Sequence, residues 1–288
     1  MSAAIERVGI IGGGLMGSGI AEVSARAGLD VVLVEISDAA AAAAQGRIAQ
    51  SLARGVERGK LEQTDADAAL ARLRCVPDFD ALADREIVIE AVIEQRDAKL
   101  DIFRRLPATV ADPGAILASN TSSIPIVELG AAAGDRGGQV LGLHFFNPVP
   151  VLSLVEVIPS LLTDEAVTVR ARAFAEDQLG KDSILAPDRA GFTVNALLVP
   201  YLLSAIRMFE QGLATAEDID EGMVKGCAHP MGPLALSDLI GLDTVLSVSE
   251  TLYREHREQL FAPPPLLQRL VAAGLLGRKS GRGLYRYG

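Results

Sequence analysis

The chain has 288 residues, of which 49% are hydrophobic and 22% charged, a balance that supports a sizeable core and excludes wholesale disorder. Its net charge of −10 provides no basic surface for nucleic acid, so any polyanionic ligand would need a local group of cations. The two cysteines lack metal-ligand spacing, no apolar run reaches the roughly 18 residues of a membrane helix, and the N-terminus lacks a signal region. We therefore expect a cytoplasmic protein with no metal site and no membrane or nucleic-acid partner.

The first part of the sequence alternates short apolar runs with helical segments. Helices are predicted at residues 18–27, 38–58 and 64–73, and buried strands at 7–11, 31–34, 87–91, 115–118 and 140–143. This alternation predicts a Rossmann-type α/β domain with a doubly wound, mostly parallel sheet.

The pattern changes after Pro187, where the strand signals end. Helices are predicted at residues 194–211, 216–223, 233–253 and 265–273. We therefore expect two domains, a sheet domain over residues 1–187 and an all-helical domain over residues 188–288.

A glycine-rich segment, Gly12-Gly13-Gly14-Leu15-Met16-Gly17, links the first predicted strand to the first helix and fits G-x-G-x-x-G. In this pattern the glycines permit a tight turn, close approach of a pyrophosphate and close helix packing. Glu35 ends the next strand, where a carboxylate accepts hydrogen bonds from a ribose 2′-hydroxyl and repels a 2′-phosphate. The sequence thus predicts an NAD site formed by Gly12, Gly14, Leu15, Met16, Gly17 and Glu35, although the loop alone also suits FAD.

One of the three histidines, His144, follows the apolar run at residues 140–143, and Glu156 lies twelve residues later in a second apolar run. A histidine oriented by a carboxylate is a general acid/base. Ser122 follows another predicted strand, so it is expected to meet His144 at the carboxyl edge of the sheet. Asn195, at the start of the helical domain, offers an amide to the same cleft. A structural His–Glu ion pair and capping roles for Ser122 and Asn195 are the alternatives.

Several motifs occur in one order along nearly the whole chain and together resemble the short-chain L-3-hydroxyacyl-CoA dehydrogenases, including the 3-hydroxybutyryl-CoA dehydrogenases. The matching segments are GGGLMGSGIA at 12–21, SNTSS at 119–123, HFFNPVP at 144–150, LVEV at 154–157, GFTVN at 191–195, PMGP at 230–233 and GRKSGRGLY at 277–285. The resemblance implies NAD-dependent interconversion of 3-hydroxyacyl and 3-oxoacyl thioesters. It also implies an N-terminal NAD-binding domain and a C-terminal substrate and dimerisation domain, and hence a homodimer.

The resemblance further assigns expected roles to single residues. His144 matches the catalytic base and Glu156 its carboxylate partner, while Ser122 and Asn195 match the polar groups that hold the reacting oxygen. The remaining matched positions are the dinucleotide contacts Glu94, Lys99, Asn147 and Lys279 and the CoA contacts Ser51 and Arg58.

Three positions that are commonly basic in the family are neutral or acidic in this sequence. Leu152-Ser153 lacks a lysine, Ala196 replaces an arginine, and Glu57 reverses a charge near the expected CoA site. None of these positions is needed for proton or hydride transfer, so the reaction class is unaffected. The departures leave open an alternative in which the same acyl group is bound to an acyl carrier protein instead of CoA.

Two other classes of protein share part of this pattern. The 3-hydroxyisobutyrate and 6-phosphogluconate type of dehydrogenase uses a lysine as acid/base, but Ala196 to Val199 after Asn195 contain none. A non-enzymatic NAD-binding protein would keep the glycine loop, yet it would have no use for His144 paired with Glu156.

Overall fold

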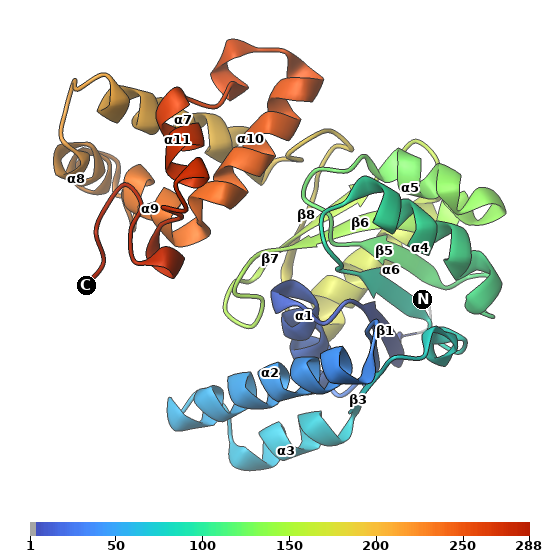
Figure 1. Cartoon of the computed structure of the whole chain (residues 1–288). Helices are drawn as coiled ribbons and strands as arrows, with labels where there is room; N and C mark the ends of the chain where they lie inside the picture. Colours follow the sequence, from blue (N-terminus) through green and yellow to red (C-terminus); the bar gives the residue numbers. More distant parts are fainter. Residues whose placement is uncertain (1–3) are drawn as a thin grey trace. The chain divides into compact units, whose positions relative to one another are not determined.

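The computed structural model describes residues 4–288, which divide into two compact units, up to Asp188 and from Arg189 onward. Figure 1 colours the first unit from blue to yellow and the second from gold to red. Each unit has its own hydrophobic core.

The first unit is built on one eight-stranded sheet with the strand order β3-β2-β1-β4-β5-β6-β7-β8. The strands from β3 to β6 are parallel, whereas β7 is antiparallel to β6 and β8 is parallel to β7. The strand bounds are β1 Arg7–Ile11, β2 Asp30–Val34, β3 Leu73–Val76, β4 Ile87–Glu90, β5 Ile116–Ser119, β6 Val140–Phe145, β7 Leu154–Pro159 and β8 Asp182–Leu185. This arrangement confirms the predicted Rossmann-type, mostly parallel sheet.

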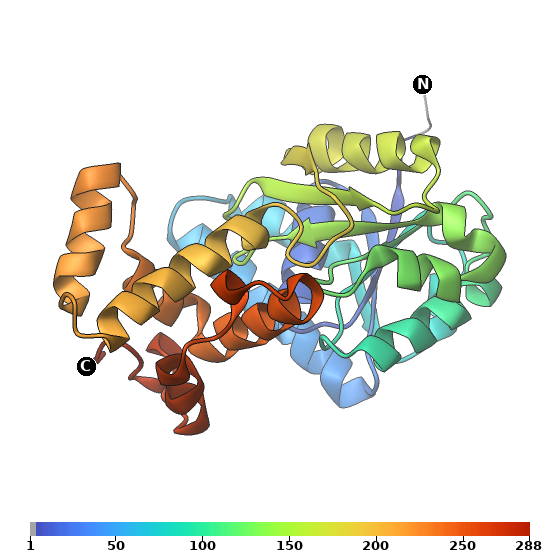
Figure 2. The same cartoon turned by 90° about the horizontal axis from the view of Figure 1, so that it is seen from above.

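Helices cover both faces of this sheet. One face, which carries Val8, Ile10 and Leu143, packs against α1, α2, α3 and α6 in a single apolar cluster. Since side chains alternate along a strand, the residues between these face the other side, toward α4 and α5. Figure 2 shows α6 on the side of the strands opposite α4 and α5. The helix bounds are α1 Leu15–Arg26, α2 Asp38–Glu57, α3 Gln63–Ala71, α4 Arg96–Thr109, α5 Ile126–Ala132 and α6 Glu165–Ala173.

Two edge elements differ from the sequence-based prediction. Residue Leu73 begins strand β3 instead of ending a helix, and strand β8 was not predicted. Both strands are short and only partly buried, so their residues lack the continuous apolar pattern by which the central strands are recognised.

The second unit, residues 189–288, consists of helices and connecting loops and contains no strand, only isolated bridges at Gly277–Arg282 and Arg282–Arg286. Its core includes Leu202, Ile206, Leu234 and Leu252. The predicted single helix at 233–253 is wrong, because Gly241, with φ of +102°, divides it into two helices. The helix bounds are α7 Val194–Glu210, α8 Ala216–Cys227, α9 Pro233–Ile240, α10 Leu242–His256 and α11 Pro265–Ala272.

Candidate active site

The antiparallel pair β6 and β7 sets His144 opposite Glu156. These two residues are direct partners in the strand register, so their side chains leave the sheet on the same face. Leu143 and Val157, the neighbouring pair, point into the apolar cluster on the other face. The hairpin between β6 and β7 thus brings His144 and Glu156 together, although they lie twelve residues apart in the sequence.

The imidazole of His144 lies between a carboxylate and a hydroxyl. Its Nδ1 is 2.7 Å from Oε2 of Glu156, and its Nε2 is 3.1 Å from Oγ of Ser122. Glu156 is fully buried and His144 is only 4% exposed. An ionised Glu156 can only accept, so Nδ1 carries the proton in the neutral ring and Nε2 accepts from Ser122. This tautomer turns the proton-accepting nitrogen toward the serine.

Ser122 lies on an irregular turn after β5, and Glu94 holds that turn. Oε1 of Glu94 accepts hydrogen bonds from the Thr121 hydroxyl at 2.6 Å and the Ser122 amide at 2.8 Å. It also accepts from the amide and hydroxyl of Ser123, at 3.0 and 2.9 Å. Asn120 ties the start of the turn to β6 by accepting from the Phe145 amide at 2.8 Å. Ser122 is therefore oriented by side chains and not by a strand ladder.

A buried ion pair lies beneath this turn. Lys99 is 1% exposed, and its ammonium group contacts Glu90 at 2.7 Å and Glu94 at 3.3 Å. Glu90 is fully buried and also accepts from the Ser119 hydroxyl at 2.6 Å. Burial alone would raise the pKa of Glu94, but the Lys99 charge and the hydrogen bonds from residues 121–123 outweigh it and lower that pKa. Lys99 therefore supports the turn from inside the protein.

The glycine loop has the geometry of a phosphate-binding turn. Gly12 has φ of +91°, and a Cβ atom on Gly17 would lie 1.8 Å from the Gly12 carbonyl oxygen. Helix α1 begins directly after Gly14, with no side chain capping its first amides. Free amides at a helix N-terminus suit an anion.

Beside the loop, Glu35 lines a cavity of about 420 Å³ together with Gly12, Ile36, Phe79, Val92 and Arg105. One oxygen of Glu35 accepts from the Gly13 amide at 2.6 Å and the other from the Ile36 amide at 3.0 Å. Each carboxylate oxygen can accept a second bond. The cavity thus combines apolar walls with a carboxylate, as a nucleoside with free ribose hydroxyls requires.

The other residues predicted to bind cofactor or substrate lie at the surface. Asn147 is exposed in the β6–β7 hairpin, Ser51 is half-buried on α2, and Arg58 is exposed where α2 ends. Their contacts with a ligand remain predictions.

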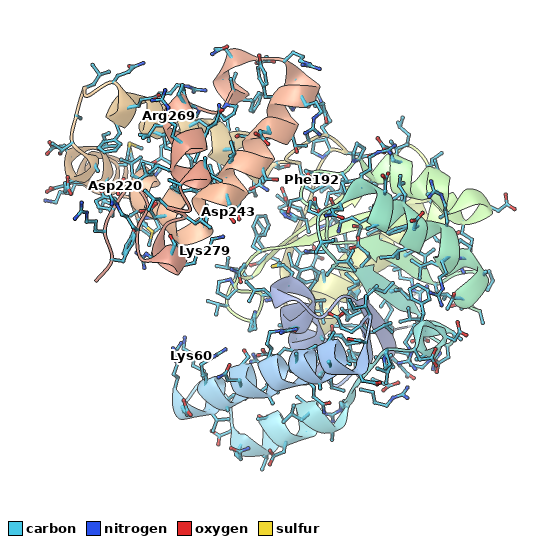
Figure 3. All side chains as sticks on the ribbon, viewed as in Figure 1. Lys60, Phe192, Asp220, Asp243, Arg269 and Lys279 are labelled. Atoms are coloured by element: carbon cyan, nitrogen blue, oxygen red, sulfur yellow. The ribbon has the colours of Figure 1, made fainter. Side chains whose placement is uncertain are left out.

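Two predicted residues belong to the second unit. Asn195 is half-buried in the first turn of α7. Lys279 is exposed and pairs with Asp243, with 2.6 Å between its Nζ and Oδ1. Figure 3 labels Lys279 and Asp243, whose side chains approach each other. The roles of Asn195 and Lys279 also remain predictions.

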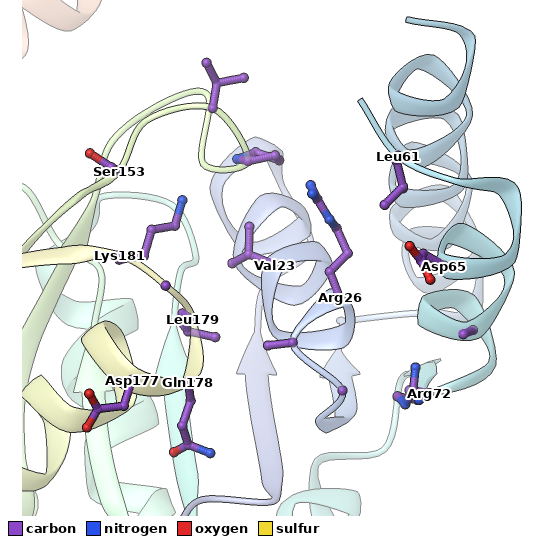
Figure 4. A pocket seen from close by; sticks show the side chains of 16 residues that line it. Val23, Arg26, Leu61, Asp65, Arg72, Ser153, Asp177, Gln178, Leu179 and Lys181 are labelled. Atoms are coloured by element: carbon purple, nitrogen blue, oxygen red, sulfur yellow. The ribbon is translucent and has the colours of Figure 1, made fainter. Parts of the chain in front are cut away.

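A larger cavity of about 810 Å³ contains none of the predicted site residues. Figure 4 shows its lining, which includes Arg26, Arg72 and Lys181 together with Asp65. Lys181 donates to the carbonyls of Val149 and Leu152 at 2.7 and 2.8 Å, so its ammonium group anchors the β6–β7 hairpin. We therefore assign this cavity no part in catalysis.

The sequence alone did not reveal three residues that organise the site. Glu90, Asn120 and Arg47 act through partners on neighbouring elements, which become adjacent only in the folded sheet. Glu90 and Asn120 each lie directly at the end of an apolar strand, and this position of a polar residue could have indicated that they belong to the site.

No group of histidine, cysteine and carboxylate side chains within residues 4–288 is arranged to hold a metal ion. In the same range, no helix is both long and apolar enough to cross a membrane.

Comparison with protein families gives two matches that together span almost the whole chain. Residues 7–189 match the NAD-binding domain of 3-hydroxyacyl-CoA dehydrogenase, and residues 191–287 match the C-terminal domain of the same enzyme. A 3-hydroxybutyryl-CoA dehydrogenase of Mycobacterium tuberculosis is 55% identical over 287 residues, which is 100% of both chains. The mitochondrial hydroxyacyl-coenzyme A dehydrogenase of Sus scrofa is 38% identical, with 98% of this chain and 91% of the relative covered.

Solved structures agree with these sequence matches. The crystal structure of FadB2 from M. tuberculosis superimposes with a TM-score of 0.98 at 54% identity, covering 99% of this chain and 100% of the other. The (S)-3-hydroxybutyryl-CoA dehydrogenase PaaH1 from Ralstonia eutropha gives a TM-score of 0.93 at 46% identity, with the same coverage of 99% and 100%.

Proposed function

Because the chain belongs to the 3-hydroxyacyl-CoA dehydrogenase family and is therefore an NAD-dependent oxidoreductase, we propose that its substrate is a short-chain thioester, (S)-3-hydroxybutyryl-CoA. The substrate is suggested by the names of the relatives in M. tuberculosis and R. eutropha. The chemistry rests on one observation, the imidazole of His144 held between Glu156 and Ser122.

His144 acts as the acid/base in this proposal. Its Nε2 takes the proton of the substrate hydroxyl during oxidation and returns it during reduction. Glu156 keeps Nδ1 protonated and stabilises the imidazolium that forms. With substrate bound, the Ser122 hydroxyl turns from Nε2 of His144 to the substrate oxygen, and Asn195 donates to the same oxygen, so that both stabilise its developing charge.

The glycine loop and Glu35 suit the dinucleotide, because the loop offers the amides of α1 and Glu35 offers acceptors to a ribose. We assign its contacts to Gly12, Gly14, Leu15, Met16, Gly17, Glu35, Glu94, Asn147 and Lys279. Bound NAD supplies the acceptor for the hydride that leaves the hydroxyl-bearing carbon. We assign Lys99 an indirect role, through its ion pairs with Glu90 and Glu94.

Ser51 and Arg58 are proposed contacts of the CoA moiety. The family and relatives support CoA as the carrier and give the carrier-protein alternative no support. Residues 1–187 are proposed to bind NAD, and residues 188–288 are proposed to complete the substrate site and to form a homodimer. We also propose that the protein is located in the cytoplasm. Sedimentation equilibrium of the purified chain tests the dimer.

The substrate is tested by steady-state kinetics with NAD. We expect oxidation of (S)-3-hydroxybutyryl-CoA and no comparable turnover of the (R) enantiomer, which serves as the matched control. In the reverse direction, acetoacetyl-CoA should have a higher kcat/KM with NADH than longer 3-oxoacyl-CoA thioesters and than the acetoacetyl group on an acyl carrier protein. Preference for the (R) enantiomer or for the carrier-bound group would overturn the proposed substrate.

A further inference from the structure

Arg47, on helix α2, donates its hydrogen bonds to the backbone of the glycine loop. Its Nε donates to the carbonyl of Gly13 at 3.1 Å, and its Nη2 donates to the same oxygen. The Ser18 hydroxyl donates to that oxygen too, at 2.7 Å. Among the described residues Arg47 forms no ion pair, although the side chain is exposed. Its charge is directed at the backbone of the glycine loop.

Glu35 holds the same glycine from the other end. It accepts from the Gly13 amide at 2.6 Å, while Arg47 binds the Gly13 carbonyl. A Cβ atom at Gly13 would lie 2.4 Å from Cβ of Ala44, so α2 also packs directly on this residue. One residue of the loop, Gly13, is therefore held through its amide by an anion and through its carbonyl by a cation.

The thiol of Cys75 on β3 is influenced by both charges. Its pKa is raised to about 11, first by burial and then by Glu35, whereas Arg47 acts to lower it. Arg47 and Glu35 thus meet at Gly13, at the edge of the cavity that Asp101 and Arg105 also line.

We propose that Arg47 is a positioning residue for the dinucleotide loop and that, together with Glu35, it determines whether a 2′-phosphate is accepted. This inference rests on the proposed assignment of the glycine loop to NAD. While Glu35 is ionised, it repels a 2′-phosphate and NAD is preferred. Where the glutamine of E35Q removes that negative charge, the planar guanidinium of Arg47 is free to turn from the Gly13 carbonyl and pair with the phosphate. In this proposal the site contains a cation that could bind a 2′-phosphate, and the negative charge of Glu35 prevents that binding.

The test is calorimetric binding of NADH and NADPH to the full chain without thioester, using R47M, E35Q and the double variant E35Q/R47M. The matched control is R54M, which removes an exposed arginine two helical turns along α2. We expect R47M to weaken NADH binding about tenfold, since a charge-assisted hydrogen bond to the loop is lost. The KM for NADH should rise by a similar factor, with a smaller change in kcat, and R54M should match the wild type.

Discrimination between the nucleotides separates this role from a merely structural one. The affinity of E35Q for NADPH should be at least about tenfold higher than that of the wild type. The double variant E35Q/R47M should lose this increase in affinity. A structural role for Arg47 would weaken NADH and NADPH equally in both backgrounds and leave their ratio unchanged, which would overturn the specificity assignment. Wild-type NADH binding in R47M would overturn the positioning role.

The proposed substrate can fail separately from this inference. Nucleotide binding is measured without thioester, so a wrong acyl group would leave every expected binding result unchanged. A wild-type chain that binds neither nucleotide would overturn both the nucleotide site and the role of Arg47.

Discussion

The two halves of the proposed catalytic hydrogen-bond chain, the His144–Glu156 pair and Ser122, are held in different ways. His144 and Glu156 face each other across β6 and β7, where the ladder of an antiparallel pair fixes their separation. Ser122 lies on an irregular turn, whose position depends on four hydrogen bonds to a single oxygen of Glu94. The strand pair is rigid through its backbone, whereas the turn is rigid only through side chains.

This difference indicates where the site is vulnerable. We expect substitutions of His144 or Glu156 to leave the backbone register of β6 and β7 intact, so they should change proton transfer and not the positions of the strands. Substitutions at Glu94 or Lys99 act on geometry, because they release the turn while leaving His144 in place. The comparison therefore predicts distinct kinetic and stability signatures for the two regions.

Among the substitutions that keep His144, the largest effect on turnover is expected for E156Q. The amide keeps the shape of the side chain but no longer stabilises an imidazolium or selects the tautomer of His144, so kcat should fall about 10³-fold. NADH binding should be unchanged, and calorimetry serves as the control. A decrease of less than tenfold would show that the strand-held pair is structural.

The largest effect on stability is expected for K99M. Removing the ammonium group leaves Glu90 buried without its counter-charge, at a cost of about 3–5 kcal/mol in the free energy of unfolding. Urea denaturation measures the loss. The control is R96M on the same helix, because the Arg96 side chain is 59% exposed and its ion pairs should contribute at most about 1 kcal/mol. Equal effects of the two substitutions would remove the support that we assign to Lys99.

A smaller effect is expected for E94Q, which removes the negative charge of the carboxylate that accepts the hydrogen bonds of the turn and pairs with Lys99. The turn should become mobile and kcat should fall about tenfold, through weaker orientation of Ser122. D97N is the control, because the Asp97 side chain is 94% exposed. Wild-type kcat in E94Q would show that the turn holds Ser122 without this carboxylate.

The lowered pKa of Glu94 adds a pH dependence to this comparison. Burial opposes ionisation, but Lys99 and the hydrogen bonds of the turn favour it more strongly. The folded pKa lies below the ordinary value of 4.5, so the stabilisation is fully present above pH 4.5 and is lost as the pH falls through the lowered value. The stability difference between wild type and E94Q should therefore shrink in acid, and a difference that grows there would contradict the assignment.

The central sheet could be predicted from sequence because parallel strands that are buried on both faces are almost continuously apolar, as at residues 7–11 and 140–143. Edge strands β3 and β8 could not, since they mix exposed and buried residues. The break at Gly241 depends on a local φ of +102°, which a helical apolar pattern does not indicate.

For the site, the pairing of His144 with Glu156 followed from spacing and from the resemblance, and the hairpin accounts for it physically. The roles of Glu90 and Arg47 did not follow, because each depends on which elements become neighbours. Lys99 was predicted as a dinucleotide contact, yet its charge is directed at two buried or partly buried carboxylates. Local sequence indicates a chemical group more readily than it indicates that group's partner.

The central claim is that His144 is the acid/base, and H144Q tests it most directly. Single-turnover reduction of acetoacetyl-CoA by NADH should be at least about 10³-fold slower than in the wild type, because a general acid/base usually contributes about 10²- to 10⁴-fold to the rate. The affinity for NADH, measured by calorimetry, should stay within about twofold of the wild-type value. Near-wild-type reduction by H144Q would contradict the account.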